Sequence, residues 1–268
     1  MTATFKDHEL AGWTAKAGAY DGYFGVVTGR LAPAFLDAAQ VRAGSRMLDI
    51  ASGPGYVAGA GAARGAEVTG LDFAAPMVEQ ARRRFPAVRF QQGDAENLPF
   101  DAASFDAVTC AFGIGHFADP DKAMREAARV LRPGGRYALS WWRADEPGFF
   151  GIFFDAVRAH GTLDVALPPA PPFQRFGDPV ELARSLESAG LGQPSVAVHE
   201  LAHEISSPEM VLEMIRRGGV RSAMVLELQP PELRPRVERA VVEAARSLMQ
   251  GGAVRVVFPA LLASAAKP

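Results

Sequence analysis

Apolar runs of strand length alternate with helical stretches from about residue 45 to residue 142. Five runs predict strands: RMLDI, EVTGLD, VRFQQGD, FDAVTCAF and RYALSWW. Three stretches between them predict helices: YVAGAGAARG, APMVEQARRRF and DPDKAMREAARVL. Strands separated by helices indicate a parallel sheet that is covered on both faces and built with right-handed crossovers.

Capping residues mark the ends of two predicted helices. Asp119 can cap one helix with Pro120 in its first turn, and the run Pro133 to Gly135 ends it. Asp178 can cap a second helix, DPVELARSLESAGL, which Gly190 ends. The segments SVAVHEL and VRVVFPALLASA then predict two further strands, which makes seven.

The remaining segments are less regular. The first 40 or so residues have a helical pattern with several aromatic side chains, and another helical stretch runs from about 208 to 249. Between 142 and 176 lies a longer connection, rich in Phe and Pro. We predict an α/β fold, namely a Rossmann-like, doubly wound, mostly parallel seven-stranded sheet with a helical lid. The expected parts are the lid at 1–44, the core at 45–145 and, at 146–268, the remainder of the sheet with helical and aromatic insertions.

Composition narrows the class of protein. The chain has 268 residues, a formal net charge of −2 and no long basic stretch, so one large domain is expected and nucleic acid is not. The three arginines from Arg82 are expected to form the solvated end of a helix. Cys110 is the single cysteine, which excludes an internal disulfide and fits a reducing compartment.

No segment has the pattern of a membrane or secretion signal. The first ten residues lack the basic and apolar regions of a signal peptide. The longest apolar stretch contains Arg255 and Pro259 and is too short to span a bilayer. We therefore expect a cytoplasmic protein without a membrane span.

Residues with useful chemistry follow the strand ends. They occur at Asp49 to Tyr56, at Asp72, at Asp94 and at Cys110 to His116. Ligands of an open parallel sheet bind beyond the carboxyl ends of its strands. The four clusters should therefore share one rim of the sheet.

The glycine turn admits two ligands. Gly53, Gly55 and Ala58 fit the loose dinucleotide fingerprint, with Asp72 at a suitable distance for a ribose. However, Asp49 stands directly before the turn, where a carboxylate would repel a pyrophosphate and attract an ammonium or sulfonium group. Asp94 could accept a hydrogen bond from an adenine amine. A cation, a ribose and an adenine together describe S-adenosylmethionine.

These segments resemble the class I S-adenosylmethionine-dependent methyltransferases, in particular the small-molecule branch of the ubiquinone and menaquinone biosynthesis type. The resemblance covers about residues 45 to 142, and the segments that carry it are LDIASGPG, VTGLD, GDAENLPF, FDAVTCAFGIGHFADP and EAARVLRPGG. One departure is Ala51, where the family usually has glycine, so we expect a slightly altered loop.

The resemblance implies the roles of individual residues in a cofactor-binding core. Asp49 and the loop of Ala51, Ser52, Gly53 and Gly55 would hold the methionine part. Asp72 would bind the ribose hydroxyls, Phe73 and Met77 would flank the adenine, and Asp94, Ala95 and Glu96 would read its amine. Ala111 would line the passage to the methyl group, and Tyr20 matches more loosely. Alternatively, Asp72 caps a helix, Asp94 is a turn residue, and Met77 belongs to the core.

The reaction needs few further groups, because a sulfonium methyl is already electrophilic. His116 is the candidate general base, although it could simply be a wall of the pocket. His160, His199 and His203 are weaker candidates. No His, Cys and acid cluster has metal spacing, so no metal is expected.

The sequence says less about the acceptor, the molecule that would receive the methyl group. The segment CAFGIGHF stands where many amino-group methyltransferases have an Asn/Asp-Pro-Pro-aromatic element, which argues against methylation of an amino group of nucleic acid or glutamine. The phenylalanines of EPGFFGIFFDAV, with Phe173 and Phe176, either line an acceptor pocket or form core. The prediction is O- or C-methylation of a small hydrophobic or aromatic metabolite. A cyclisation on the same fold, an NAD-dependent oxidoreductase, a non-catalytic binding module and a homodimer stay open.

Overall fold

The structure is a computed structural model that describes residues 3–144 and 148–268. The expected boundary between the core and the C-terminal part, at residues 145 and 146, lies outside the described residues. One sheet runs through the described chain in the order β3-β2-β1-β4-β5-β8-β6, and the short β7 pairs with β8. The strands are β1 (Arg46–Ile50), β2 (Glu67–Asp72), β3 (Arg89–Gln92), β4 (Phe105–Ala111), β5 (Leu131–Trp142), β6 (Gly192–Ile205), β7 (Met249–Gln250) and β8 (Ala253–Ala266).

The first five strands are parallel, and β8 and β6 join them antiparallel. β1 is buried on both faces from Met47 to Ile50, as expected for a central parallel strand. The predicted doubly wound, mostly parallel α/β fold is confirmed. Some strand bounds differ from the prediction: β3 ends before Asp94, β5 begins at Leu131 rather than after the glycines, and β6 is longer than SVAVHEL at both ends.

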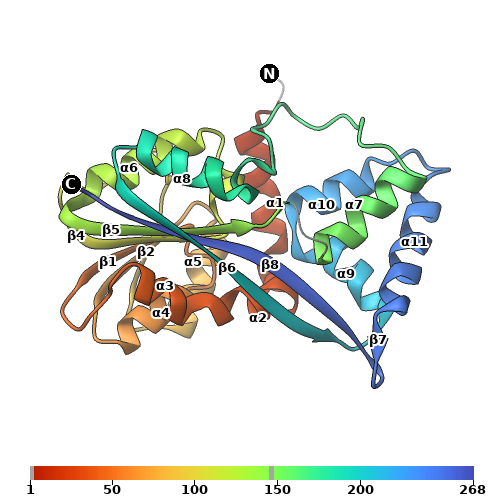
Figure 1. The fold of residues 1–268 in the computed structure, drawn as a ribbon, viewed down its shortest axis with the longest axis horizontal. Coiled ribbons are helices and arrows are strands. Elements are labelled where there is room, and N and C mark those ends of the chain that lie inside the picture. The colour runs from red at the N-terminus through yellow and green to blue at the C-terminus, as the bar shows by residue number, and fades with distance from the viewer. Residues whose placement is uncertain (1–2, 145–147) are drawn as a thin grey trace.

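Helices cover both faces of the sheet (Figure 1). α6 (Pro120–Val130) and α8 (Pro179–Ser188) lie on one face, and α3 (Ala32–Ala38), α4 (Tyr56–Ala63) and α5 (Ala75–Arg84) lie on the other. Both predicted caps are confirmed, because Asp119 accepts a hydrogen bond from the Lys122 amide and Asp178 accepts bonds from the amides of Val180 and Glu181.

The N-terminal segment forms a nearly continuous helical path. α1 (Phe5–Tyr20) passes through a π-helical turn at Asp21–Gly25 into α2 (Val26–Thr28). Figure 1 shows α1 between the carboxyl edge of the sheet and a group of helices beyond it. Its long-range hydrogen bonds include one that Lys16 donates to the carbonyl of Arg216 and one that Gln80 donates to that of Ala17.

The helices beyond α1 form what we call the helical lobe. Its members are α7 (Phe149–His160), α9 (Pro208–Gly218), α10 (Val220–Glu227) and α11 (Arg234–Ser247). The predicted helical stretch from 208 to 249 is thus broken into three helices, at Gly218-Gly219 and at Pro230-Pro231. α7 occupies part of the segment predicted only as a connection, because Phe149, Phe153 and Val157 are four residues apart and fully buried.

No helix in the described ranges is long and apolar enough to cross a membrane.

Candidate functional site

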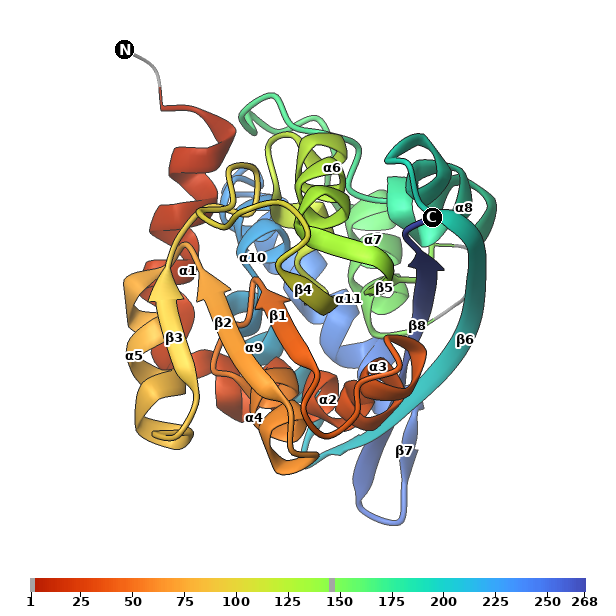
Figure 2. The ribbon, with the colours of Figure 1, turned by 90° about the vertical axis from the view of Figure 1, so that its left-hand side faces the viewer.

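Three cavities meet at the carboxyl edge of the parallel strands, toward which β1, β2 and β3 point in Figure 2. The rim cavity, of about 460 Å³, is lined by Trp13, Tyr20, Ala51, Gly53, Asp72, Phe73, Met77, Ala111, Phe112, Gly113, His116 and Phe117. The acidic cavity, of about 310 Å³, is lined by Lys6, Ala51, Leu71, Phe73, Gly93, Asp94, Ala95, Glu96, His116 and Phe117.

The third space is the aromatic cavity, of about 420 Å³. It is lined by Trp13, Tyr20, Phe24, Thr28, Phe112, His116, Trp142, Phe150, Phe173, Gly218, Gly219, Val220, Arg221 and Ser222. It shares Trp13, Tyr20, Phe112 and His116 with the rim cavity. Among the described residues, His116 alone lines all three cavities.

The loop between β1 and α4 has an unusual backbone. Ala51, Gly53 and Gly55 have φ angles of 51°, 51° and 88°, in the left-handed region. Glycine adopts this region freely, whereas alanine pays roughly 1–2 kcal/mol of strain. Ala51 thus takes up a glycine-like conformation, and the loop still reaches the wall of both the rim and the acidic cavities.

Asp72 ends β2 with its side chain at the rim cavity. Its carboxylate accepts hydrogen bonds from the amides of Gly53, at 2.8 Å, and Ala74, at 2.9 Å. Burial raises its pKa to about 6, against the lowering effect of those two amides. It therefore fastens the glycine loop to the start of α5 while facing the cavity.

Asp49, unlike Asp72, is buried behind the glycine loop and does not line the rim cavity. It is 1% exposed and accepts hydrogen bonds from the Thr109 hydroxyl at 2.7 Å and the Ala58 amide at 3.1 Å. Burial raises its pKa to about 7. Asp49, Ser52 and Gly55 line none of the three cavities, so their predicted contacts with a ligand stay predictions.

The acidic cavity brings together the three residues expected to read an adenine. The Asp94 carboxylate accepts a hydrogen bond of 2.9 Å from the Glu96 amide, so Asp94 also stabilises the turn, as the alternative reading expected. The Glu96 carboxylate accepts a hydrogen bond of 2.8 Å from the Ala118 amide. Lys6 reaches both carboxylates from α1, at 2.5 Å and 3.2 Å. Sequence reasoning missed Lys6.

The apolar wall of the rim cavity joins α1 to α5. Met77 is 3% exposed and packs with Ala17, Trp13, Tyr20 and Phe73, so it is both core and cavity wall. The Tyr20 hydroxyl lies 3.1 Å from that of Thr28, and burial raises its pKa to about 12.

His116 follows β4 in a short turn, as predicted, and has a partner that the sequence did not reveal. Its Nδ1 lies 2.9 Å from a carboxylate oxygen of Glu9, which is 1% exposed. The same oxygen accepts the Trp13 indole N–H at 3.1 Å. The spacing of Phe5, Glu9 and Trp13, four residues apart, would have placed Glu9 on the inner face of its helix.

The other histidines lie elsewhere. The Nδ1 of His203 is 3.1 Å from the Arg30 guanidinium, and His160 lines a separate groove between α7 and α11. His199 lies in β6, the last strand in the order of the sheet. In the described ranges, no cluster of three His, Cys, Asp or Glu residues could hold a metal ion.

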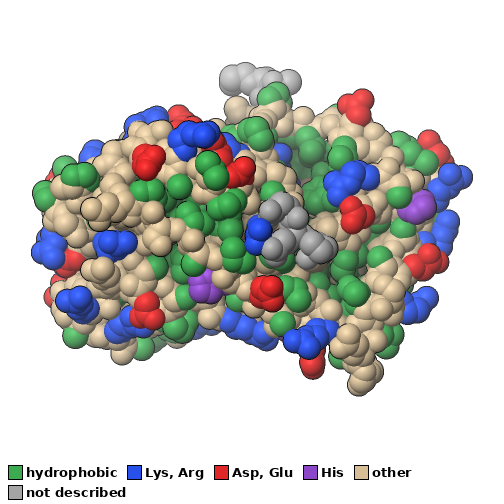
Figure 3. Space-filling view, viewed as in Figure 1, with side chains coloured by type: hydrophobic (Ala, Val, Ile, Leu, Met, Phe, Trp, Pro, Cys, Tyr) green, Lys and Arg blue, Asp and Glu red, His purple; other side chains and the backbone are tan. Residues whose placement is uncertain are grey.

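The predicted phenylalanines divide between core and cavity. Phe149, Phe153 and Phe176 are fully buried, whereas Phe150 and Phe173 line the aromatic cavity. Figure 3 shows hydrophobic side chains gathered in the middle of this face of the molecule, with many of the charged ones toward its edges. The remaining aromatic walls come from three other segments, namely the N-terminal helices, the turn after β4 and the end of β5, which is why the pattern around α7 alone did not reveal them.

Comparison with known proteins identifies the core. Residues 48–139 match the family described as methyltransferase domain. The demethylmenaquinone methyltransferase of Thermus thermophilus is 46% identical over 125 residues, which are 44% of this chain and 57% of that protein. The chain therefore matches little more than half the length of that relative.

Two solved structures share the fold. The YcgJ protein of Bacillus subtilis is 24% identical, with a TM-score of 0.58 over 89% of this chain and 98% of that one. Phosphoethanolamine N-methyltransferase 2 of Haemonchus contortus, in complex with phosphomonomethylethanolamine and S-adenosylhomocysteine, is 20% identical, with a TM-score of 0.62 over 100% of this chain and 61% of that one. The expected resemblance to the class I S-adenosylmethionine-dependent methyltransferases is thus confirmed for residues 48–139, which carry most of β1 to β5.

Proposed function

We propose that the protein transfers a methyl group from S-adenosylmethionine to a small hydrophobic or aromatic acceptor. The observation that carries this proposal is the position of His116, where the rim cavity, the acidic cavity and the aromatic cavity meet. The first two cavities lie over the family's cofactor motifs, and the third opens beside them.

The residues present fit the cofactor. A Cβ added at Gly53 would meet no atom within 4 Å, so the loop leaves open space where a ligand can approach the backbone.

We assign the binding roles from this arrangement. The loop from Ala51 to Gly55, with Asp49 behind it, would hold the methionine part. Asp72 would accept the ribose hydroxyls, and Phe73 and Met77 would flank the adenine. Asp94, Ala95 and Glu96 would face its amine. Tyr20 and Ala111 would close the side toward the acceptor.

When bound, the cofactor supplies an electrophilic methyl group on a sulfonium centre. The chain itself has to orient the acceptor and exclude water, and orientation can supply roughly 7–11 kcal/mol of the barrier. Trp13 of α1 and Phe112 line both the rim cavity and the aromatic cavity and supply apolar walls for this purpose. Residues 1–44 thus act as the lid, over a cofactor-binding core and the acceptor-binding insertions of 146–268.

Glu9 orients the proposed base. A carboxylate can only accept a hydrogen bond, so the hydrogen of the neutral imidazole lies on Nδ1 of His116, and the Nε2 lone pair is left to accept a proton. Within the described ranges Nε2 has no hydrogen-bond partner. A base is needed for a hydroxyl or carbon acid but not for a free amine, so O- or C-methylation is favoured.

The test is incubation of the protein with a metabolite extract and methyl-labelled S-adenosylmethionine, followed by mass spectrometry. The proposal predicts one or more labelled small molecules and an equal amount of S-adenosylhomocysteine. A changed metabolite without S-adenosylhomocysteine would favour the cyclisation alternative. The absence of any product from extracts that support a control methyltransferase would count against the proposal.

The cellular setting is proposed on narrower grounds. Cys110 is a free, buried thiol and the chain has no disulfide partner for it, which supports a reducing, cytoplasmic compartment. The near-neutral net charge supports a small-molecule acceptor rather than nucleic acid. A homodimer stays a proposal that sedimentation would test.

A further inference from the structure

The aromatic cavity contains one cationic side chain, that of Arg221 at the start of α10. Its guanidinium carbon lies 4.9 Å from the ring centre of Phe173 and 5.4 Å from that of Phe5. Its hydrogen bond is a long one, 3.3 Å to the carbonyl of Pro171. In the described ranges no carboxylate lies within ion-pair distance of it.

A charge in this position is costly without a partner. Arg221 is half-buried, and desolvation lowers its pKa. The charge of Glu9 acts against this lowering, but its carboxylate oxygen is already shared by Trp13 and His116. Aromatic rings stabilise a guanidinium partly, but they leave its planar set of N–H donors without acceptors.

From the position of this charge we infer that the acceptor molecule is an aromatic carboxylate, whose carboxylate binds Arg221 while its ring lies against Phe173. This inference rests on the proposed function and adds the class of substrate. The amino end of α10 faces the same cavity through Gly219, Val220 and Ser222, and its partial positive charge favours an anion as well.

The same residues suggest which end of the acceptor reacts. The Phe173 ring centre is 6.4 Å from that of His116 and 4.9 Å from the Arg221 guanidinium carbon, and all three side chains line the aromatic cavity. A molecule lying along Phe173 can therefore reach Arg221 with its carboxylate and His116 with its other end. A ring hydroxyl at that end would lose its proton to His116 and gain the methyl group, so a hydroxyaryl carboxylic acid fits both groups.

The test is calorimetric titration of the protein, saturated with S-adenosylhomocysteine, with hydroxyaryl carboxylates of one to three rings and with the matching neutral carboxamides. The inference predicts that at least one acid binds wild type about tenfold or more tighter than its amide. In Arg221→Gln this preference falls to near one, and Arg221→Lys restores part of it. Arg217→Gln, an exposed arginine on the preceding helix, should keep the wild-type preference.

The outcomes separate this inference from the proposed function. The inference would be overturned if none of the acids binds wild type more tightly than its carboxamide, or if the preference for the acid is undiminished in Arg221→Gln. Unchanged affinity of Arg221→Gln for S-adenosylhomocysteine shows that the variant is folded. Failure of the wild type to bind S-adenosylhomocysteine would instead contradict the proposed function. The same titrations of acid and amide on the protein alone would still test the inference.

Discussion

At the scale of single residues, three left-handed backbone positions shape the loop that we assign to the cofactor. The strain of Ala51 and of Phe112, whose φ is 56°, lies in the wall of the rim cavity, where strained backbone often accompanies function. Gly53 is the position where a side chain would stand in open space. It is therefore the position most suited to test whether that space holds a ligand.

Gly53→Ala should weaken S-adenosylhomocysteine binding by roughly tenfold or more, because a methyl group would project into the cavity. Gly134→Ala is the matched control, since Gly134 also has a left-handed φ, of 77°, and open space at its Cβ. Both variants should lose about 1–2 kcal/mol of unfolding free energy from backbone strain. Equal cofactor affinities in the two variants, measured by calorimetry, would place the ligand elsewhere.

The pair of Glu9 and His116 carries the second prediction at this scale. Once an acceptor is known, His116→Ala should lower kcat about 10²-fold or more, because proton removal is lost. Glu9→Gln should lower kcat less and change its pH profile, since the amide no longer stabilises a protonated imidazole. A raised KM with unchanged kcat in both variants would make His116 a wall of the pocket only.

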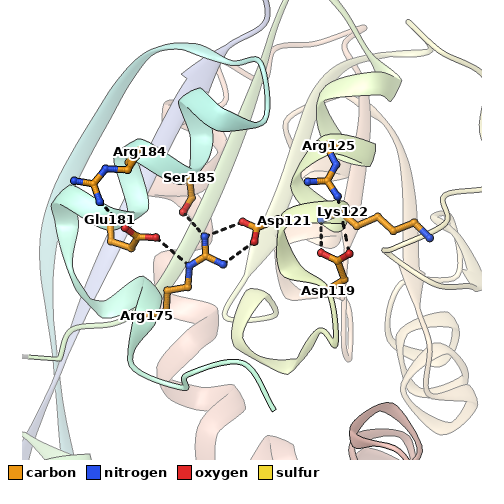
Figure 4. A network of polar contacts seen from close by, with 8 residues as sticks. All are labelled: Asp119, Asp121, Lys122, Arg125, Arg175, Glu181, Arg184 and Ser185. Atoms are coloured by element: carbon orange, nitrogen blue, oxygen red, sulfur yellow. Dashed lines mark hydrogen bonds and ion pairs between the residues drawn. The ribbon is translucent and has the colours of Figure 1, made fainter. Parts of the chain in front are cut away.

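At the scale of elements, one arginine network fixes the loop that carries Phe173. Figure 4 shows Arg175 between α6 and α8, where it binds Asp121 through two hydrogen bonds of 2.7 and 2.8 Å. It also donates to Glu181 at 3.0 Å and to the Ser185 hydroxyl at 3.2 Å. The Phe173 carbonyl in turn accepts the Trp141 indole N–H at 2.9 Å. The acceptor wall is thus tied to α6 and α8 through Arg175 and to β5 through Trp141.

Arg175→Ala should loosen this wall. We expect a loss of about 1–2 kcal/mol of unfolding free energy and a several-fold rise in the KM of the acceptor, with cofactor affinity unchanged. Arg184→Ala is the control, because its exposed guanidinium binds Glu181 alone in this network and should contribute under about 0.5 kcal/mol. A cofactor affinity that falls together with acceptor affinity in Arg175→Ala would mean that the loop supports the whole site.

At the scale of the whole molecule, the site depends on segments that the chain brings together from far apart. Motifs within the parallel half are local: a strand, a turn and an acid lie in one short stretch, so the sequence alone predicted the sheet, the caps and the positions of Asp72 and His116. Glu9 and Arg221 could not be predicted in this way. Glu9 meets His116 across 107 residues, and Arg221 joins the cavity from a helix that no family motif covers.

Two buried carboxyls also affect the stability of the whole molecule. The pKa of Asp49 is raised to about 7 and that of Asp72 to about 6, both by burial, from an ordinary 3.8. Between about pH 4 and pH 7 the folded state therefore binds more protons at these two groups than the unfolded state does. Their contribution to stability consequently falls as the pH rises through that window.

Asp72→Asn should remove part of this dependence. Between pH 5 and pH 8, the unfolding free energy of the variant should rise by about 1–3 kcal/mol relative to that of wild type, because its amide does not ionise. Urea unfolding at the two pH values measures the difference. Parallel pH profiles for the two proteins would show that Asp72 keeps an ordinary pKa when folded.

The most direct test of the account is calorimetric titration of the wild-type protein with S-adenosylmethionine and, separately, with NAD. The account predicts saturable binding of S-adenosylmethionine, weakened by about 1–3 kcal/mol in Asp72→Ala, and no binding of NAD at the same concentrations. Saturable binding of NAD with no response to S-adenosylmethionine, or an Asp72→Ala variant with wild-type affinity, would contradict it.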